Sequence, residues 1–290
     1  MQPFPSAQAP PPWVRPLPPF SFAAVLITAN RSPRPNYLLT TLDNLLTHGG
    51  LRAAPPELHT FTIIDGTADD LYWALDTLDP LAGREVGCVS GALPANRNVA
   101  YALRFAASVG APWVLFLEDD IDVCADFFAS TAAWLADFAD PRYPIFPLGA
   151  NYPQVDAPTN YGCAWEYPID KFYGTQALAL RADTAVSVAD YIDTHCYSRT
   201  HDGTAYDLLI ADWARANGYG SFLTPAPSFV QHIGRESVIR PRAETHVFPS
   251  WRGHRWSYVR DAAASAAPGD ADSGSDGSSN RSTKLFVDGQ

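Results

Sequence analysis

Three adjacent acidic residues, Glu118, Asp119 and Asp120, follow an unbroken apolar run from Trp113 to Leu117. A run this short, without polar alternation, is typical of a strand that is buried on both faces in a parallel sheet. Adjacent carboxylates repel one another, so they need cations or good hydrogen-bond donors nearby. A hard divalent cation with oxygen ligands meets that need and commonly sits against substrate phosphates. The pattern fits a metal site and fits equally well a solvated acidic turn after a core strand.

The pattern of apolar residues along the chain predicts strands that alternate with helices. Strands are expected at 22–28, 61–64 and 113–117, with a further strand of the same sheet after 172–174 and a short edge strand at 222–223. Helices are expected at 37–46, 69–78, 96–109, 125–138, 182–192 and 205–217. The segment 140–170, rich in Pro, Tyr, Asn and Gly, is expected to form irregular hairpins or loops. This order predicts an α/β fold with a mostly parallel, doubly wound, Rossmann-like sheet.

The carboxyl ends of the predicted parallel strands lie at Thr28, Asp65 and Glu118. In a doubly wound sheet these ends share one edge, and ligands bind beyond that edge. The first strand is not followed by a GxGxxG pattern, and the chain contains no GxxxxGK[ST] pattern. The sequence therefore predicts a nucleotide site at this edge that is neither a dinucleotide-binding loop nor a P-loop.

The composition limits the partners and the organisation of the chain. Its 290 residues, 47% of them apolar, can form one large α/β domain, and the net charge of −11 argues against a nucleic acid or an anionic membrane as partner. We expect a Pro-rich, disordered arm at 1–19, a single domain at 20–260 and a disordered tail at 261–290. The sequence shows no signal peptide and no membrane span, which predicts a soluble, cytoplasmic protein. The four cysteines lack CxxC spacing and favour buried free thiols over a disulfide framework.

Three segments carry a resemblance to a known family: the helix start at 98–101 (NVAY), the acids within 117–121 (LEDDI) and the later segment 231–234 (QHIG). Together they resemble the N-acetylglucosaminyltransferase IV family of metal-dependent glycosyltransferases. The acids followed by Asp-Phe-Phe at 126–128 more distantly resemble N-acetylglucosaminyltransferase I. The resemblance covers about 20–239 and implies a GT-A fold. It also implies transfer from a nucleotide-sugar donor, a UDP-sugar such as UDP-GlcNAc, to a glycan or other acceptor.

The resemblance implies roles for the acids and for the downstream histidine. Asp120 would hold Mn²⁺ or Mg²⁺, with His232 as a second metal ligand. Glu118 would face the ribose of the donor, and Asp119 would assist. Considered alone, a single histidine such as His232 is more often a core or surface residue than a ligand.

The same resemblance implies further contacts to the donor from the predicted strand ends and from one helix. The loop after the first strand would touch the nucleotide, and the fork of Arg31 suits a phosphate. Asp65 would hydrogen-bond the uracil ring. The alternatives are a surface arginine and a turn-forming aspartate before a glycine. The full set of expected donor contacts beyond the acids is Thr28, Ala29, Arg31, Asp65, Arg97 and Asn98.

An inverting transfer needs one general base within reach of the acceptor hydroxyl. In enzymes of this type the base is a carboxylate at the start of a helix after the acceptor region, which corresponds to Asp207. Asp202 is the next candidate, and Asp212 lies deeper in the predicted helix. The alternative for Asp207 is that it favours the helix dipole only.

Two other classes of function fit part of the pattern. One is a nucleotide-sugar or carbohydrate-binding module without catalysis, and the other is a metal-dependent phosphoesterase or phospho-receiver. The low lysine content argues against a receiver, which needs a downstream lysine. Trp165 and the segment 251–256 are either stacking platforms for an acceptor sugar or packing residues.

Overall fold

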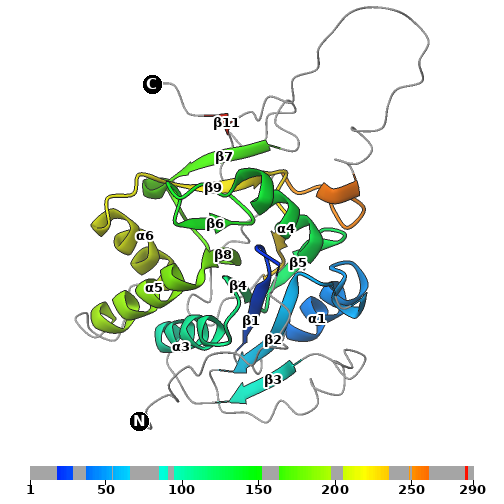
Figure 1. The fold of residues 1–290 in the computed structure, drawn as a ribbon, viewed down its shortest axis with the longest axis horizontal. Helices are drawn as coiled ribbons and strands as arrows, with labels where there is room; N and C mark the ends of the chain where they lie inside the picture. The colour runs from blue at the N-terminus through cyan, green and yellow to red at the C-terminus, as the bar shows by residue number, and fades with distance from the viewer. Residues whose placement is uncertain are drawn as a thin grey trace, which may run out of the picture.

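The computed structural model describes residues 18–28, 37–53, 55–65, 85–90, 95–151, 163–196, 205–234, 248, 250–260 and 285–286 (Figure 1). Its helices are α1 (Leu38–Thr47), α3 (Ala95–Ser108), α4 (Phe127–Phe138), α5 (Ala182–His195) and α6 (Tyr206–Ala216), with short 3-10 turns η1 (Leu51–Ala53) and η5 (Ile169–Lys171). Its strands are β1 (Phe22–Thr28), β2 (Leu58–Asp65), β3 (Glu85–Ser90), β4 (Trp113–Glu118), β5 (Ile121–Val123), β6 (Ile145–Pro147), β7 (Cys163–Pro168), β8 (Ala177–Arg181), β9 (Ser221–Ala226), β10 (Val230–His232) and β11 (Leu285–Phe286).

The central sheet has six strands in the order β3-β2-β1-β4-β8-β6. Strands β3, β2, β1 and β4 are parallel, whereas β8 pairs antiparallel with both β4 and β6. The chain moves outward from β1 to β3 and then returns to place β4 on the other side of β1. The strand order therefore reverses between β1 and β4, where open α/β sheets form their ligand crevice. The predicted α/β class with a mostly parallel, doubly wound sheet is confirmed.

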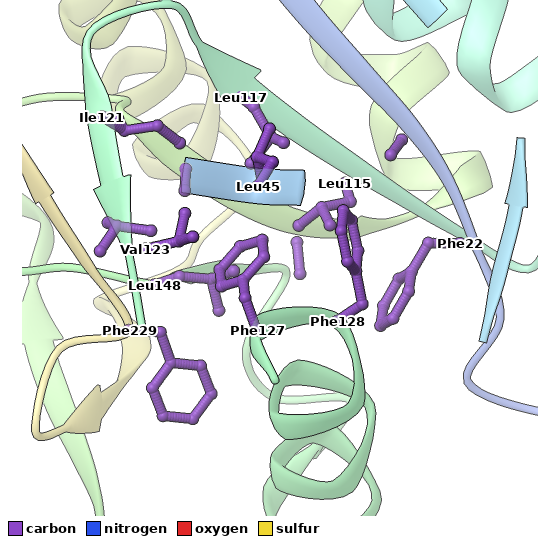
Figure 2. Packing of buried hydrophobic residues seen from close by; sticks show 14 of the residues in the cluster. Phe22, Leu45, Leu115, Leu117, Ile121, Val123, Phe127, Phe128, Leu148 and Phe229 are labelled. Carbon is purple, nitrogen blue, oxygen red and sulfur yellow. The ribbon is translucent and has the colours of Figure 1, made fainter. Parts of the chain in front are cut away.

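Helices cover both faces of this sheet, as the unbroken apolar runs of β1 and β4 require. In β4, Leu115 and Leu117 face a core shared with α1 and α4, while Val114 and Phe116 face a second core shared with α3, α5 and α6. Figure 2 shows Phe128 of α4 beside Leu115 in the first core. In Figure 1 the two sets of helices lie on opposite sides of the strands. A strand buried on both faces leaves no position for polar alternation.

Two smaller sheets complete the described structure. Strands β5 and β10 form an antiparallel ribbon in which His232 is in register with Ile121. Strand β7 lies between β9 and β11 in a three-stranded sheet. No helix in the described ranges is long and apolar enough to cross a membrane.

The structure corrects several predictions about local elements. The segment expected to form irregular hairpins or loops, 140–170, contains the strands β6 and β7. Their conformation depends on pairing with β8 and β9, and the local amino-acid composition does not reveal that pairing. Strand β9 is longer than the pair 222–223, and β3 was not predicted. Near the C-terminus, Leu285–Phe286 forms β11, which pairs parallel with β7. The helix expected at 69–78, the arm 1–17 and the segment 261–284 lie outside the described residues.

Two of the expected free thiols are described. Cys124 is buried and Cys196 is half-buried, and both are free. Burial raises the pKa of the Cys124 thiol, and the Asp126 carboxylate adds to that effect. Cys124 is therefore a small packing residue and not a reactive nucleophile.

Candidate functional site

The acidic turn, which consists of Glu118, Asp119 and Asp120, lies at the point where the strand order reverses, between the carboxyl ends of β1 and β4. Thr28 at the end of β1 is in register with Asp65 of β2, and the preceding Ile27 is in register with Glu118. The Thr28 hydroxyl donates to Asp119 Oδ2 over 2.6 Å. Because Asp119 is only 2% exposed, this donor offsets part of the cost of burying its carboxylate. The predicted shared edge of β1, β2 and β4 is confirmed.

The Thr41 hydroxyl of α1 holds the backbone of the acidic turn in place. It lies 2.7 Å from the Asp119 carbonyl oxygen and 2.9 Å from the Ile121 carbonyl oxygen, and it accepts from Ile121 N–H over 3.2 Å. Sequence reasoning missed Thr41. The available signal was a polar residue on the apolar face of an amphipathic helix, beside Leu38, Leu42 and Leu45.

The β5–β10 ribbon brings His232 to the last acid of the turn. His232 Nε2 lies 3.2 Å from Asp120 Oδ2, and the Ile233 N–H donates to the Asp120 carbonyl oxygen over 2.9 Å. The two side chains are 12% and 9% exposed, so both are largely shielded from solvent. The structure thus brings together the two residues that the family resemblance implies as metal ligands.

Gly234 approaches this pair closely, and its lack of a side chain makes that approach possible. A Cβ at position 234 would lie 2.7 Å from His232 Nε2 and closer still to Asp120 Oδ2. A carboxylate oxygen and an imidazole nitrogen are a donor set that suits Mn²⁺, and the carboxylate also suits Mg²⁺. Within the described ranges no group of three or more His, Cys, Asp or Glu side chains is placed to hold a metal. The residues present therefore fit a cation that takes its remaining ligands from substrate oxygens and water.

Glu118, the first acid, is hydrogen-bonded by two other elements. Its Oε1 accepts from the Tyr206 hydroxyl of α6 over 2.7 Å and from the hydroxyl of Thr175, which precedes β8. Burial of its carboxyl raises the pKa of Glu118 to about 7, with a further contribution from the Asp120 carboxylate. The hydrogen bonds from Thr175 and Tyr206 act in the opposite direction. In the protein alone, burial and, after it, the Asp120 carboxylate thus oppose ionisation of Glu118, and a bound cation would favour the ionised form.

The remaining expected donor contacts are placed only in part. Ala29 and Arg31 lie outside the described residues, as does the side chain of Asp65. Arg97 and Asn98 lie in the first turns of α3, with Arg97 exposed and Asn98 buried. Helix α3 follows β3, so its N-terminus lies toward the carboxyl edge of the sheet. Their contact with a donor stays a prediction.

The proposed base, Asp207, is the second residue of α6 and is 8% exposed. Its Oδ1 accepts from the Leu208 N–H over 2.8 Å. Its neighbour Tyr206 contacts Glu118, so the first turn of α6 lies at the same edge as the acids. Asp202 is outside the described residues, and Asp212 forms a surface ion pair with Arg215.

The tryptophans considered as stacking platforms differ in their surroundings. Trp165 is buried in the core beneath α3, α5 and α6. Trp256 packs on Phe229 with ring centroids 5.4 Å apart, and Trp251 meets His254 edge-on at 6.1 Å. Burial of Trp165 and the contact of Trp256 favour packing over sugar stacking for these two residues.

Neither the models of known protein families nor the sequences of curated proteins give a match to this chain. Solved structures do resemble it. The mannosyltransferase PcManGT from Pyrobaculum calidifontis, in complex with GDP-Man and Mn²⁺, is 15% identical with a TM-score of 0.43 over 75% of this chain. TarS 1-349 of S. aureus is 14% identical with a TM-score of 0.46 over 71% of this chain. This chain covers 61% and 60% of the lengths of those two chains. At these values neither likeness assigns an activity to this chain, and the specific resemblance to N-acetylglucosaminyltransferases IV and I stays a prediction.

Proposed function

We propose that this protein is a metal-dependent, inverting glycosyltransferase of the GT-A type. The donor is a nucleotide sugar, a UDP-sugar such as UDP-GlcNAc, and the acceptor is a hydroxyl of a glycan or glycoconjugate. The observation that carries the proposal is the Asp120–His232 pair, held beside Gly234 at the point where the sheet order reverses. A site with two protein ligands and no side chain at position 234 suits a cation that also binds a substrate diphosphate.

Each residue at this edge of the sheet has a separate role in the proposed reaction. Asp120 and His232 hold Mn²⁺ or Mg²⁺, which when bound offsets the charge of the leaving diphosphate. Glu118 faces the ribose, and Asp119 assists by holding the end of β1 through Thr28. The other donor contacts come from Ala29, Arg31, Asp65, Arg97 and Asn98. Asp207 accepts the proton of the acceptor hydroxyl as that oxygen attacks the anomeric carbon, and the nucleoside diphosphate leaves from the opposite face.

A thermal-shift screen of nucleotide sugars with and without Mn²⁺ tests the donor site. A ligand at 100 times its Kd stabilises the native state by about 2.7 kcal/mol. That corresponds to a rise in Tm of about 5 °C or more for a domain of this size. We expect the rise only when metal and donor are both present. Asp120→Ala should abolish it, whereas Asp43→Ala, an exposed acid on α1, should leave it intact.

Product analysis separates the proposed transferase from the other classes. A transferase releases nucleoside diphosphate at an appreciable rate only when an acceptor is present. A binding module releases none, and a phosphoesterase releases phosphate or nucleotide without an acceptor. Acceptor-independent release at full rate, or metal-dependent binding that survives in Asp120→Ala, would contradict the proposal.

A further inference from the structure

One contact joins the acidic turn to the helix that carries the proposed base. The Tyr206 hydroxyl donates to Glu118 Oε1 over 2.7 Å, and Tyr206 is the first residue of α6. In the sequence 88 residues separate these two side chains. Tyr206 thus connects the end of β4, where the donor site lies, with the first turn of α6.

The hydrogen bond between Tyr206 and Glu118 is well suited to fix the position of the first turn of α6 relative to β4. Burial and the neighbouring Glu118 carboxylate raise the pKa of Tyr206 well above its usual range, so its hydroxyl stays a donor at all physiological pH values. The Thr175 hydroxyl donates to the same Oε1 atom. The Glu118 N–H donates to the Gln176 carbonyl oxygen over 2.9 Å, so the backbone of β4 is fixed beside Thr175. Glu118 is therefore tied both to the segment before β8 and to α6.

The placement of Asp207 follows from that of Tyr206. The two residues are adjacent in the first turn of α6, and Asp207 Oδ1 is committed to the Leu208 N–H over 2.8 Å. Residues Leu209, Ile210 and Trp213 pack the rest of α6 into the core. A small rotation or shift of the first turn would therefore move Asp207 without unpacking the helix.

We propose that Tyr206 is a positioning residue that sets the place of Asp207 relative to the donor by holding Glu118. This inference rests on the proposed function, because it assigns Asp207 as the base. Reacting groups must be held within a narrow range of distance and angle, and a displacement of about 1 Å can cost about 100-fold in rate. Tyr206 touches neither the sugar nor the metal in this scheme; it acts through Glu118 and α6.

Steady-state kinetics of Tyr206→Phe test the proposal. The variant keeps the ring and removes the one hydroxyl. We expect kcat to fall by about 10-fold or more, with the donor Kd changed by less than about 2-fold. The matched control is Tyr258→Phe, which removes another partly buried hydroxyl that donates to a carboxylate, Asp137 Oδ2, over 2.6 Å. Its kcat should equal that of the wild type, although both variants lose some stability.

A double-mutant cycle with Asp207→Asn tests whether Tyr206→Phe lowers kcat through the position of Asp207. If Tyr206 acts by placing Asp207, adding Tyr206→Phe to Asp207→Asn lowers kcat no further. A full 10-fold additional loss in that background would overturn the proposal. So would a Tyr206→Phe variant with normal kcat and lowered Tm, because that result shows a structural role only. A loss confined to donor affinity would overturn it as well.

Hydrogen exchange gives a readout that does not depend on turnover. The Leu208 and Leu209 N–H groups both donate to the Ala205 carbonyl oxygen in the first turn of α6. We expect these amides to exchange faster in Tyr206→Phe than in the wild type and in Tyr258→Phe. Unchanged exchange would overturn the inference even if the protein transfers no sugar, whereas faster exchange without any transferase activity would place the failure in the proposed function.

Discussion

His232 Nε2 lies 3.2 Å from Asp120 Oδ2, although 112 residues separate them in the sequence. The antiparallel pairing of β5 and β10 accounts for this proximity, because it sets His232 opposite Ile121. The Ile233 N–H also donates to the Asp120 carbonyl oxygen and so joins the backbones next to the two side chains. The pair is thus fixed by backbone pairing and does not depend on flexible side chains alone.

His232→Ala should weaken Mn²⁺ affinity by about 10-fold or more, the scale of losing a supporting contact at a metal site. The loss arises because Asp120 would be the one remaining ligand of the pair. Electron paramagnetic resonance of free Mn²⁺, titrated in the presence of a nucleoside diphosphate, measures it. His254→Ala is the matched control, since His254 forms a similar pair with Asp122 Oδ2 at 3.0 Å. Equal affinities of wild type and His232→Ala would remove His232 from the metal site.

Gly234→Ala should impair metal binding through the added Cβ alone. That atom would lie 2.7 Å from His232 Nε2, so the imidazole or the Asp120 carboxylate must move away from the shared space. We expect Mn²⁺ affinity to fall by about 10-fold or more, with Tm lowered modestly. Gly220→Ala is the control, because a Cβ there has no atom within 4 Å. Normal Mn²⁺ affinity in Gly234→Ala would mean that no cation occupies this space.

Thr41→Val should destabilise the fold and also weaken the metal site. Valine keeps the shape but leaves the Ile121 N–H and two carbonyl oxygens without the Thr41 hydroxyl. Such a loss costs about 1–3 kcal/mol in the free energy of unfolding, measured with denaturant. Thr131→Val is the control, because the Thr131 hydroxyl donates to the Phe127 carbonyl oxygen within α4. If Mn²⁺ affinity is unchanged in Thr41→Val, the hydroxyl supports the core but not the position of the acids.

The sequence predicted the sheet and the acidic turn well, and the reason is physical. The runs 22–28 and 113–117 have no polar alternation because each lies between two layers of helices. That double burial can be read from the sequence of each run, and it places Glu118 at the edge of the sheet where open α/β folds generally bind ligands. The short strands β6 and β7 have no such signature, because their conformation depends on pairing with distant strands.

The parts of the site that sequence reasoning missed depend on tertiary contacts. Thr41 and Tyr206 belong to helices that were predicted, but nothing in a helical pattern says which side chain reaches the acids. His232 was predicted as a metal ligand only through the family resemblance, because the residues around it in the sequence are unremarkable. Its place beside Asp120 follows from a register that only the folded ribbon shows.

Asp207→Asn should abolish most turnover while leaving donor binding nearly unchanged. The asparagine retains Oδ1, the atom that accepts from the Leu208 N–H, so the start of α6 is preserved. It cannot take up the proton of the acceptor hydroxyl, and loss of a general base typically costs about 10²- to 10⁴-fold in kcat. Asp183→Asn is the matched control, because Asp183 Oδ1 accepts from the Thr184 N–H at the start of α5. Its kcat should equal that of the wild type.

The stereochemistry of the product provides the second half of this test. One base supports one in-line displacement, so the anomeric configuration of the product should be inverted relative to the donor. Proton NMR of the anomeric signal during the reaction distinguishes the two outcomes. Retention would require a second step and a nucleophile that this scheme does not contain. Retention, or normal turnover in Asp207→Asn, would therefore exclude Asp207 as the base of a single displacement.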